Sequence, residues 1–123
     1  MKKDNLILEK SFGFALKIVD LYKYLVRENE YIISKQILKS GTSIGANVEE
    51  ATAVQSRRDF ITKMAIASKE ARETKYWLRL LTKSKMTTRD CSLLIKEIDE
   101  IINIITAIVK TAQNNLKMNL SKN

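Results

Sequence analysis

The chain has no proline, no histidine, one cysteine and only three glycines among its 123 residues. Loop-rich and all-β folds need many chain-reversing residues, so the scarcity of proline and glycine favours long helices. Without histidine the protein lacks the commonest general base and the commonest transition-metal ligand. A single cysteine excludes an internal disulfide framework and is typical of a reducing compartment. We therefore expect a helical, cytoplasmic protein that is not an enzyme.

Positive charge is what the chain has in excess. Lys and Arg number 22 against 14 Asp and Glu, which gives a formal net charge of +8. This balance favours an anionic partner, with nucleic acid ahead of an acidic protein. A surface that is basic only for solubility stays open as an alternative. The most apolar stretch, residues 101–109, is too short to cross a bilayer, so we expect no membrane partner.

Apolar residues recur at helical spacing of three and four in successive segments. The pattern predicts helices at about residues 5–28, 31–54, 57–83 and 88–114, followed by a polar C-terminal tail that frays. Short connections make successive helices antiparallel. The predicted fold is therefore all-α, a single up-down-up-down four-helix bundle over residues 1–123.

Residues at the segment ends support these boundaries. Asn29 is able to take the left-handed conformation that ends a helix. Ser56 and Asp59 form a near capping box at the start of the third helix. We expect Thr87 or Thr88 to cap the fourth.

Two features of the first two helices predict how they pack. The first helix has two apolar stripes, one of Leu8, Phe12, Ala15, Val19, Tyr22 and Val26 and another of Phe14, Ile18, Leu21 and Leu25. Their combined arc is wider than one bundle seam needs, so we expect part of it to face another subunit. In the second helix, Gly41 and Gly45 each cost about 1 kcal/mol of helix propensity. We expect a neighbouring helix to approach closely there.

Residues that could support catalysis or bind a metal are few. The carboxylates on the two middle helices that a divalent cation could use are Glu49, Glu50, Glu70 and Glu73. No calcium-type loop surrounds them, so we predict no metal and no cofactor, and we expect Glu73 to pair with Lys69. Cys91 has no histidine partner to activate it as a nucleophile. An enzyme that uses Glu50 and Glu70 is the weakest of the functional hypotheses.

A polar row follows the second helix at steps of three and four. It consists of Ser40, Ser43, Asn47 and Glu50. The row lies about 60° from the apolar stripe at ~100° per residue, which is a boundary position. Two interpretations stay open: a half-solvated flank, or a hydrogen-bonded network that fixes helix register or builds a site.

The third helix concentrates the positive charge. Residues 57–83 contain eight basic and three acidic residues, a net +5 of the total +8. One face of this helix is predicted to bind nucleic acid through Arg58, Lys69, Arg72, Tyr76, Arg79 and Lys83. Basic side chains suit phosphate, and an interleaved aromatic suits stacking on an unpaired base. A solvated basic face without a ligand is the competing interpretation.

Residues 40–51, with the sequence SGTSIGANVEEA, and residues 68–81 carry a family resemblance. They resemble the bacterial four-helix-bundle proteins encoded in intervening sequences of 23S ribosomal RNA genes. The matching positions are Ser43, Ile44, Asn47 and Glu50, with Glu70 and Trp77 on the third helix. Val48 is a conservative change, and Ala51 replaces the family's usual glycine.

The resemblance implies an up-down bundle and a ring-like homo-oligomer, most often a pentamer. It also implies kinship with the accessory protein of diversity-generating retroelements, a basic pentameric bundle that binds a reverse transcriptase and nucleic acid. The intervening-sequence proteins themselves have no established activity. Our leading hypothesis is a non-enzymatic oligomer that binds nucleic acid, RNA before DNA. The alternative is a scaffold that recruits an acidic or polymerase-like protein.

Overall fold

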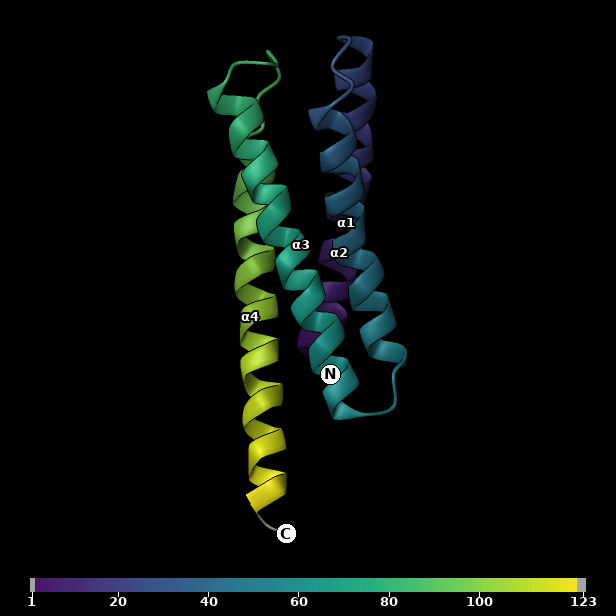
Figure 1. The fold of residues 1–123 in the computed structure, drawn as a ribbon, viewed down its shortest axis with the longest axis vertical. Coiled ribbons are helices and arrows are strands. Elements are labelled where there is room, and N and C mark those ends of the chain that lie inside the picture. Colours follow the sequence, from purple (N-terminus) through teal and green to yellow (C-terminus); the bar gives the residue numbers. More distant parts are fainter. Residues whose placement is uncertain (1, 122–123) are drawn as a thin grey trace.

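The described part of the chain forms four antiparallel helices (Figure 1). The computed structural model describes the backbone of residues 2–121 and the side chains of residues 5–120. The helices are α1 (Lys2–Arg27), α2 (Ile33–Ala53), α3 (Arg57–Lys83) and α4 (Ser92–Ser121). Each packs on its neighbours in the chain, and α1 also contacts α4. The predicted all-α up-down bundle is confirmed.

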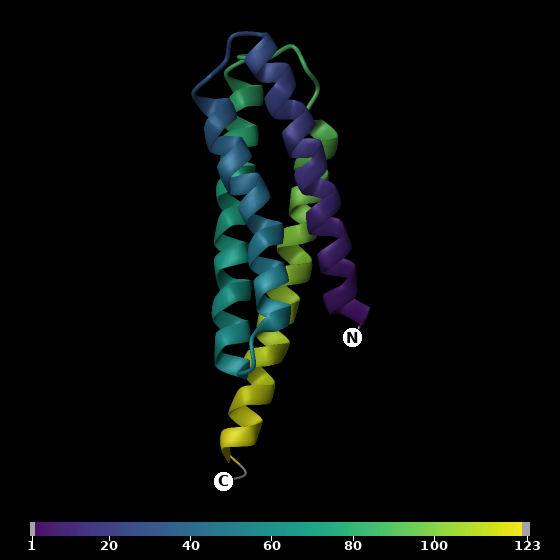
Figure 2. The same cartoon turned by 90° about the vertical axis from the view of Figure 1, so that its right-hand side faces the viewer.

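The C-terminal part of α4 extends beyond the neighbouring ends of α2 and α3, at the end of the bundle where α1 begins (Figure 2). We predicted a fraying polar tail from about residue 114, and this is wrong because α4 continues to Ser121. No proline or glycine occurs after Gly45 to stop the helix. In addition, half-buried Leu116 extends the stripe of buried Ala112 by one four-residue step.

The inward faces of the helices form one hydrophobic core. On α1 the buried stripe is the second of the two, and Phe14, Ile18 and Leu21 are at most 1% exposed. The first stripe stays at the margin, and Phe12 is 63% exposed. On the other helices the apolar residues that recur at helical spacing also face the core, and the buried ones are Ile37, Ile44, Val48, Ala51, Met64, Ala67, Ala71, Leu78, Leu81, Ile98, Ile101, Ile105, Ile108 and Ala112.

Close approach of α1 to α2 explains the glycines of α2. A Cβ atom on Gly41 would lie 2.9 Å from both Cγ atoms of Ile18. At Gly45 it would lie 3.4 Å from the carbonyl oxygen of Ser11. The predicted approach is confirmed, and at Gly41 no larger residue fits unless Ile18 moves.

The turn between α1 and α2 is built by two adjacent residues. Asn29 has a φ of 66°, and the N–H of Glu30 donates to the Leu25 carbonyl, so α1 ends as predicted in a left-handed turn. The Glu30 carboxylate then accepts hydrogen bonds from the N–H groups of Ile33 and Ser34 at 2.6 and 2.9 Å. It therefore caps α2, although glutamate is not a usual capping residue and no sequence pattern predicts this role for it.

The two later helix starts differ in how well they were predicted. The Ser56 hydroxyl accepts from the N–H of Asp59 at 3.1 Å, which confirms the cap of α3. At α4 the expected threonine caps are wrong, because the helix begins at Ser92. The Thr87 hydroxyl instead accepts from the N–H of Arg89 within the connection. Asp90 accepts from the N–H of Ser92 at 2.9 Å and thereby serves the first turn of α4.

Within residues 2–121 no helix combines the length and the apolar character needed to cross a membrane.

Candidate nucleic-acid interface

The residues predicted to bind nucleic acid lie on the solvent side of α3. All six are exposed, namely Arg58, Lys69, Arg72, Tyr76, Arg79 and Lys83. The opposite face of the same helix carries buried Met64, Ala71 and Leu78. Positions 72, 76, 79 and 83 repeat at steps of four and three, which keeps them on one side of the helix. Core packing of α3 therefore turns this face outward.

None of the cations on this face forms an ion pair with a carboxylate that the structure describes. Among the described side chains, α3 makes ion pairs through Lys63 with Glu50 and through Lys75 with Asp99, both at 2.7 Å. Those lysines flank the predicted face. The predicted pair of Lys69 with Glu73 is wrong, because Glu73 accepts instead from the Trp77 indole N–H, at 3.4 Å.

Part of the face lines a groove between α3 and α4. The groove has a volume of about 470 Å³. Its lining residues are Arg72, Lys75, Tyr76 and Arg79 from α3 and Asp99, Ile102, Asn103 and Thr106 from α4. The structure thus brings together three of the six predicted residues. Arg58, Lys69 and Lys83 share the face but do not line the groove.

Sequence reasoning missed the α4 wall of this groove. Asp99, Asn103 and Thr106 follow each other at steps of four and three, so they form a polar row on one side of α4. An Arg72 Nη atom lies 3.5 Å from the Thr106 hydroxyl, at the limit of a hydrogen bond. The signal for this row is present in the sequence, because Asp99, Asn103 and Thr106 recur at the same helical spacing as the apolar residues of α4.

Tyr76 is held in place by its neighbour in the chain. The rings of Tyr76 and Trp77 meet edge to face, with centroids 5.1 Å apart and an interplanar angle of 75°. Trp77 is half-buried and packs against the core. Tyr76 is 57% exposed, so its ring is braced on one side and open to solvent on another.

Two residues of the polar row of α2, Ser40 and Glu50, contact α3. Ile44 is buried in the core. The hydroxyls of Ser40 and Thr74 are joined at 2.8 Å in the interior, and Glu50 reaches Lys63. This part of the polar row therefore links two helices, as the network interpretation required.

The middle of the polar row behaves differently. The Ser43 hydroxyl donates to the Lys39 carbonyl at 2.6 Å, and the Asn47 amide donates to the Ser43 carbonyl at 2.8 Å. Both bonds stay within α2. The Glu70 carbonyl accepts from the Thr74 hydroxyl within α3. The motif residues thus organise helices and do not converge on a reaction centre.

No catalytic arrangement forms among the described residues. Cys91 is 1% exposed, and burial raises the pKa of its thiol, so the group stays protonated and out of reach. No three carboxylate or thiol groups within residues 5–120 come together as a metal site. Glu50 is committed to Lys63.

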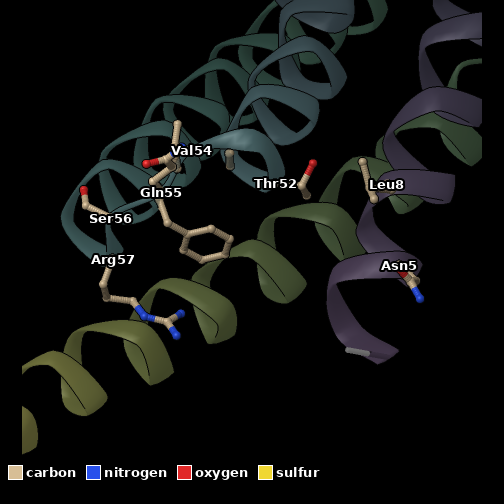
Figure 3. Close-up of a pocket in the computed structure, with 9 residues that line it drawn as sticks. Asn5, Leu8, Thr52, Val54, Gln55, Ser56 and Arg57 are labelled. Carbon is tan, nitrogen blue, oxygen red and sulfur yellow. The ribbon is translucent and has the colours of Figure 1, made fainter.

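A second hollow lies at the end of the bundle, between the start of α1 and the α2–α3 connection (Figure 3). Its volume is about 390 Å³. The lining includes Asn5, Leu8, Thr52 and Phe60, and its one charged member is Arg57, whose guanidinium lies 5.7 Å from the Phe60 ring centroid. The described lining of this hollow therefore contains a single charged group and no acid–base pair.

Comparison with known proteins gives one family. The family model described as "23S rRNA-intervening sequence protein" matches residues 3–107. A crystal structure of a Bacteroides thetaiotaomicron protein of unknown function, from the S23 ribosomal protein family, is 50% identical with a TM-score of 0.84. The match covers 88% of this chain and 98% of that one. No curated protein matches the chain.

Proposed function

Since the chain belongs to the 23S rRNA-intervening sequence protein family, which has no known catalytic activity, we propose that it is a non-enzymatic, nucleic-acid-binding oligomer. RNA is the favoured ligand, and the basic face of α3 is the binding surface. The cytoplasm is the expected location, since the one cysteine is a free thiol.

The observation that carries this proposal is the state of the α3 cations. Arg58, Lys69, Arg79 and Lys83 are exposed on one face, and none of them pairs with a described carboxylate. Some cations outside this face do pair, as Lys10 with Glu100, whereas others, such as Lys23 on α1, form no ion pair with a described side chain, so what distinguishes α3 is that four such cations share one face. Cations left without intramolecular partners keep their full attraction for phosphate.

Oligomerisation would multiply this modest surface. Apolar side chains stay exposed on α1 and α4, among them Phe12 at 63%, Leu16 at 58% and Leu93 at 65%. Such residues suit contact with further copies of the chain. A ring, with a pentamer favoured by the family resemblance, would present several basic faces to one nucleic acid, so that avidity supplies most of the affinity.

The test is a binding measurement on purified protein at rising ionic strength, with RNA and DNA of one sequence. Binding should weaken with a log–log slope of about −0.7 per phosphate contact on a single strand. Reversing two α3 charges, Arg79→Glu with Lys83→Glu, should abolish most binding. The matched control, Lys35→Glu with Lys39→Glu on α2, changes net charge equally and should retain most of it. No salt-dependent binding to either nucleic acid at low ionic strength would refute the proposal.

Oligomeric state and bound nucleic acid are measured together by light scattering before and after nuclease treatment. A ring should keep its mass once nucleic acid is removed. A monomer after nuclease would contradict the oligomer and leave only a single basic face per particle.

A second candidate is a scaffold that recruits an acidic or polymerase-like protein. It is favoured by Leu80, 38% exposed beside Tyr76, because arginine and aromatic residues around an apolar centre are typical of protein interfaces. In that case Arg72→Glu with Arg79→Glu would abolish capture of the partner and leave RNA binding unaffected.

A further inference from the structure

The groove between α3 and α4 has three kinds of chemistry on its walls, and a nucleotide needs all three. Arg72 and Arg79 offer guanidinium groups that suit phosphate. Tyr76 offers an exposed aromatic ring to the flat face of a base. Asn103 offers an amide that donates and accepts, as the edge of a base does.

The order of these groups along α3 matches the order in a nucleic-acid strand. Tyr76 stands between the two arginines, at steps of four and three. The arginine Cα atoms are therefore separated by ~10 Å along the axis, at ~1.5 Å per residue. One base on the ring would have a phosphate on each side. The groove volume of about 470 Å³ is in the range of small-molecule sites.

We propose that the α3–α4 groove is a subsite for one unpaired nucleotide of a single strand. The base stacks on Tyr76, its edge meets Asn103 and Thr106, and the flanking phosphates contact Arg72 and Arg79. The inference rests on the proposed function and narrows it from nucleic acid in general to single strands. A base within a duplex cannot enter, because stacking covers both of its faces.

Asp99 gives the subsite a built-in restraint. Its carboxylate lies in the groove and pairs with Lys75 at 2.7 Å, and both side chains are more than a third exposed. The pair holds Lys75 away from the ligand and places a negative charge near the phosphate path. Asp99→Asn should therefore tighten binding to a single strand. A gain of affinity has the further merit that loss of folding cannot produce it.

The experiment compares single strands with a duplex of the same sequence, on the full chain in its native assembly. The probe is an oligonucleotide containing 2-aminopurine, used as RNA and as DNA. Tyr76→Leu should weaken single-strand binding ~5–150-fold, the range for loss of one stacked base. It should also remove the quenching of 2-aminopurine. Tyr76→Phe keeps the ring and should behave as the parent protein.

The outcomes separate this subsite from the basic face as a whole. If Tyr76→Leu leaves single-strand binding unchanged while Arg79→Glu with Lys83→Glu abolishes it, the subsite is wrong and the proposed function stands. Equal binding of duplex and single strand by the parent protein likewise overturns the subsite alone. Absence of binding to any probe overturns both. Weaker binding by Asp99→Asn contradicts the assigned phosphate path.

Discussion

Helix α1 meets its two neighbours by different means. Against α2 it packs through small residues, and Ile18 fills the space that Gly41 leaves. Against α4 and the connection before it, α1 relies on ion pairs, such as Lys10 with Glu100 at 3.0 Å and Lys17 with Glu97 at 2.5 Å. The first seam is closely packed. The second is polar and partly open.

The open seam also contains hollows between its two helices. Two hollows lie along α1 and α4, of about 380 and 260 Å³, and Leu16 and Leu93 line the larger one while exposed. Exposed ion pairs contribute about 0–1 kcal/mol each, so they set register more than they stabilise. The comparison teaches that α1 packs mainly on α2 and leaves its α4 side available for other contacts.

The largest expected effect comes from truncating the close seam. Ile18 has no exposed surface, so Ile18→Ala should destabilise the fold by about 2–5 kcal/mol. Leu16→Ala, on the same helix but 58% exposed, should change stability by less than about 0.5 kcal/mol. Urea unfolding at one protein concentration measures both. If both variants lost the same free energy of unfolding, the two sides of α1 would contribute equally to stability, which would contradict the comparison.

Replacing a glycine by alanine should change the stability of the fold in opposite directions at the two seams. In Gly41→Ala, overpacking against Ile18 should destabilise the fold by about 1–3 kcal/mol. The better helix propensity of alanine should offset up to about 1 kcal/mol of this loss. Gly13→Ala, which lines a hollow of the open seam with nothing within 4 Å of its added Cβ, should stabilise by about 1 kcal/mol.

A double-mutant cycle identifies the cause at Gly41. In the Ile18→Ala background the clashing Cγ atoms are gone, so Gly41→Ala should become stabilising. If Gly41→Ala costs the same in both backgrounds, contact with Ile18 is not the reason for the glycine.

Removing charge from the open seam should have a small effect. Lys10→Gln with Lys17→Gln should lower stability by about 0–2 kcal/mol in total at low salt, and by less at high salt. Lys23→Gln is the control, because this exposed lysine of α1 makes no ion pair with a described side chain. Thermal unfolding at the two salt concentrations gives the comparison. A loss that salt does not reduce would show that the lysines stabilise by packing.

The smallest effect is expected at Asp90, at the edge of the open seam. The hydrogen bond from the Ser92 N–H lowers the pKa of Asp90 below its usual 3.8. A lowered folded-state pKa gives stability that is present above the unfolded pKa and lost as pH falls through the folded one. In the Asp90→Asn variant the melting temperature should therefore fall slightly less than in the parent protein as the pH is lowered from 5 into the acid range. An unchanged profile would place the acid sensitivity in other carboxylates.

Local signals in the sequence predicted the helices well, because each depends on a few adjacent residues. The bounds of α3, its Ser56 cap and the turn at Asn29 needed no knowledge of the fold. The cap from Glu30 could not be predicted, since a glutamate reaches those N–H groups only in one geometry of the turn. The end of α4 differs from the prediction because a polar composition does not by itself end a helix, and no proline or glycine is present there to do so.

Of the two walls of the candidate site, the sequence predicts the one on α3 and does not predict the one on α4. Charge and spacing place Arg72, Tyr76 and Arg79 on one face from the sequence alone. The opposite wall, Asn103 and Thr106, depends on how α4 crosses α3, and that follows from core packing. For the same reason, spacing on α1 revealed two apolar stripes but not which one faces the core.

The pairing of each helix with its successor has a consequence for the order of folding. The contact of Ser40 with Thr74 closes a loop of 34 residues, whereas that of Lys10 with Glu100 closes one of 90. By the (3/2)RT ln n rule the longer closure costs about 1 kcal/mol more in chain entropy. The α1–α4 seam, whose closure costs more chain entropy, is also the one with the weaker contacts. We therefore expect helix hairpins to assemble first, and the α1–α4 edge to close last and to open first in native fluctuations.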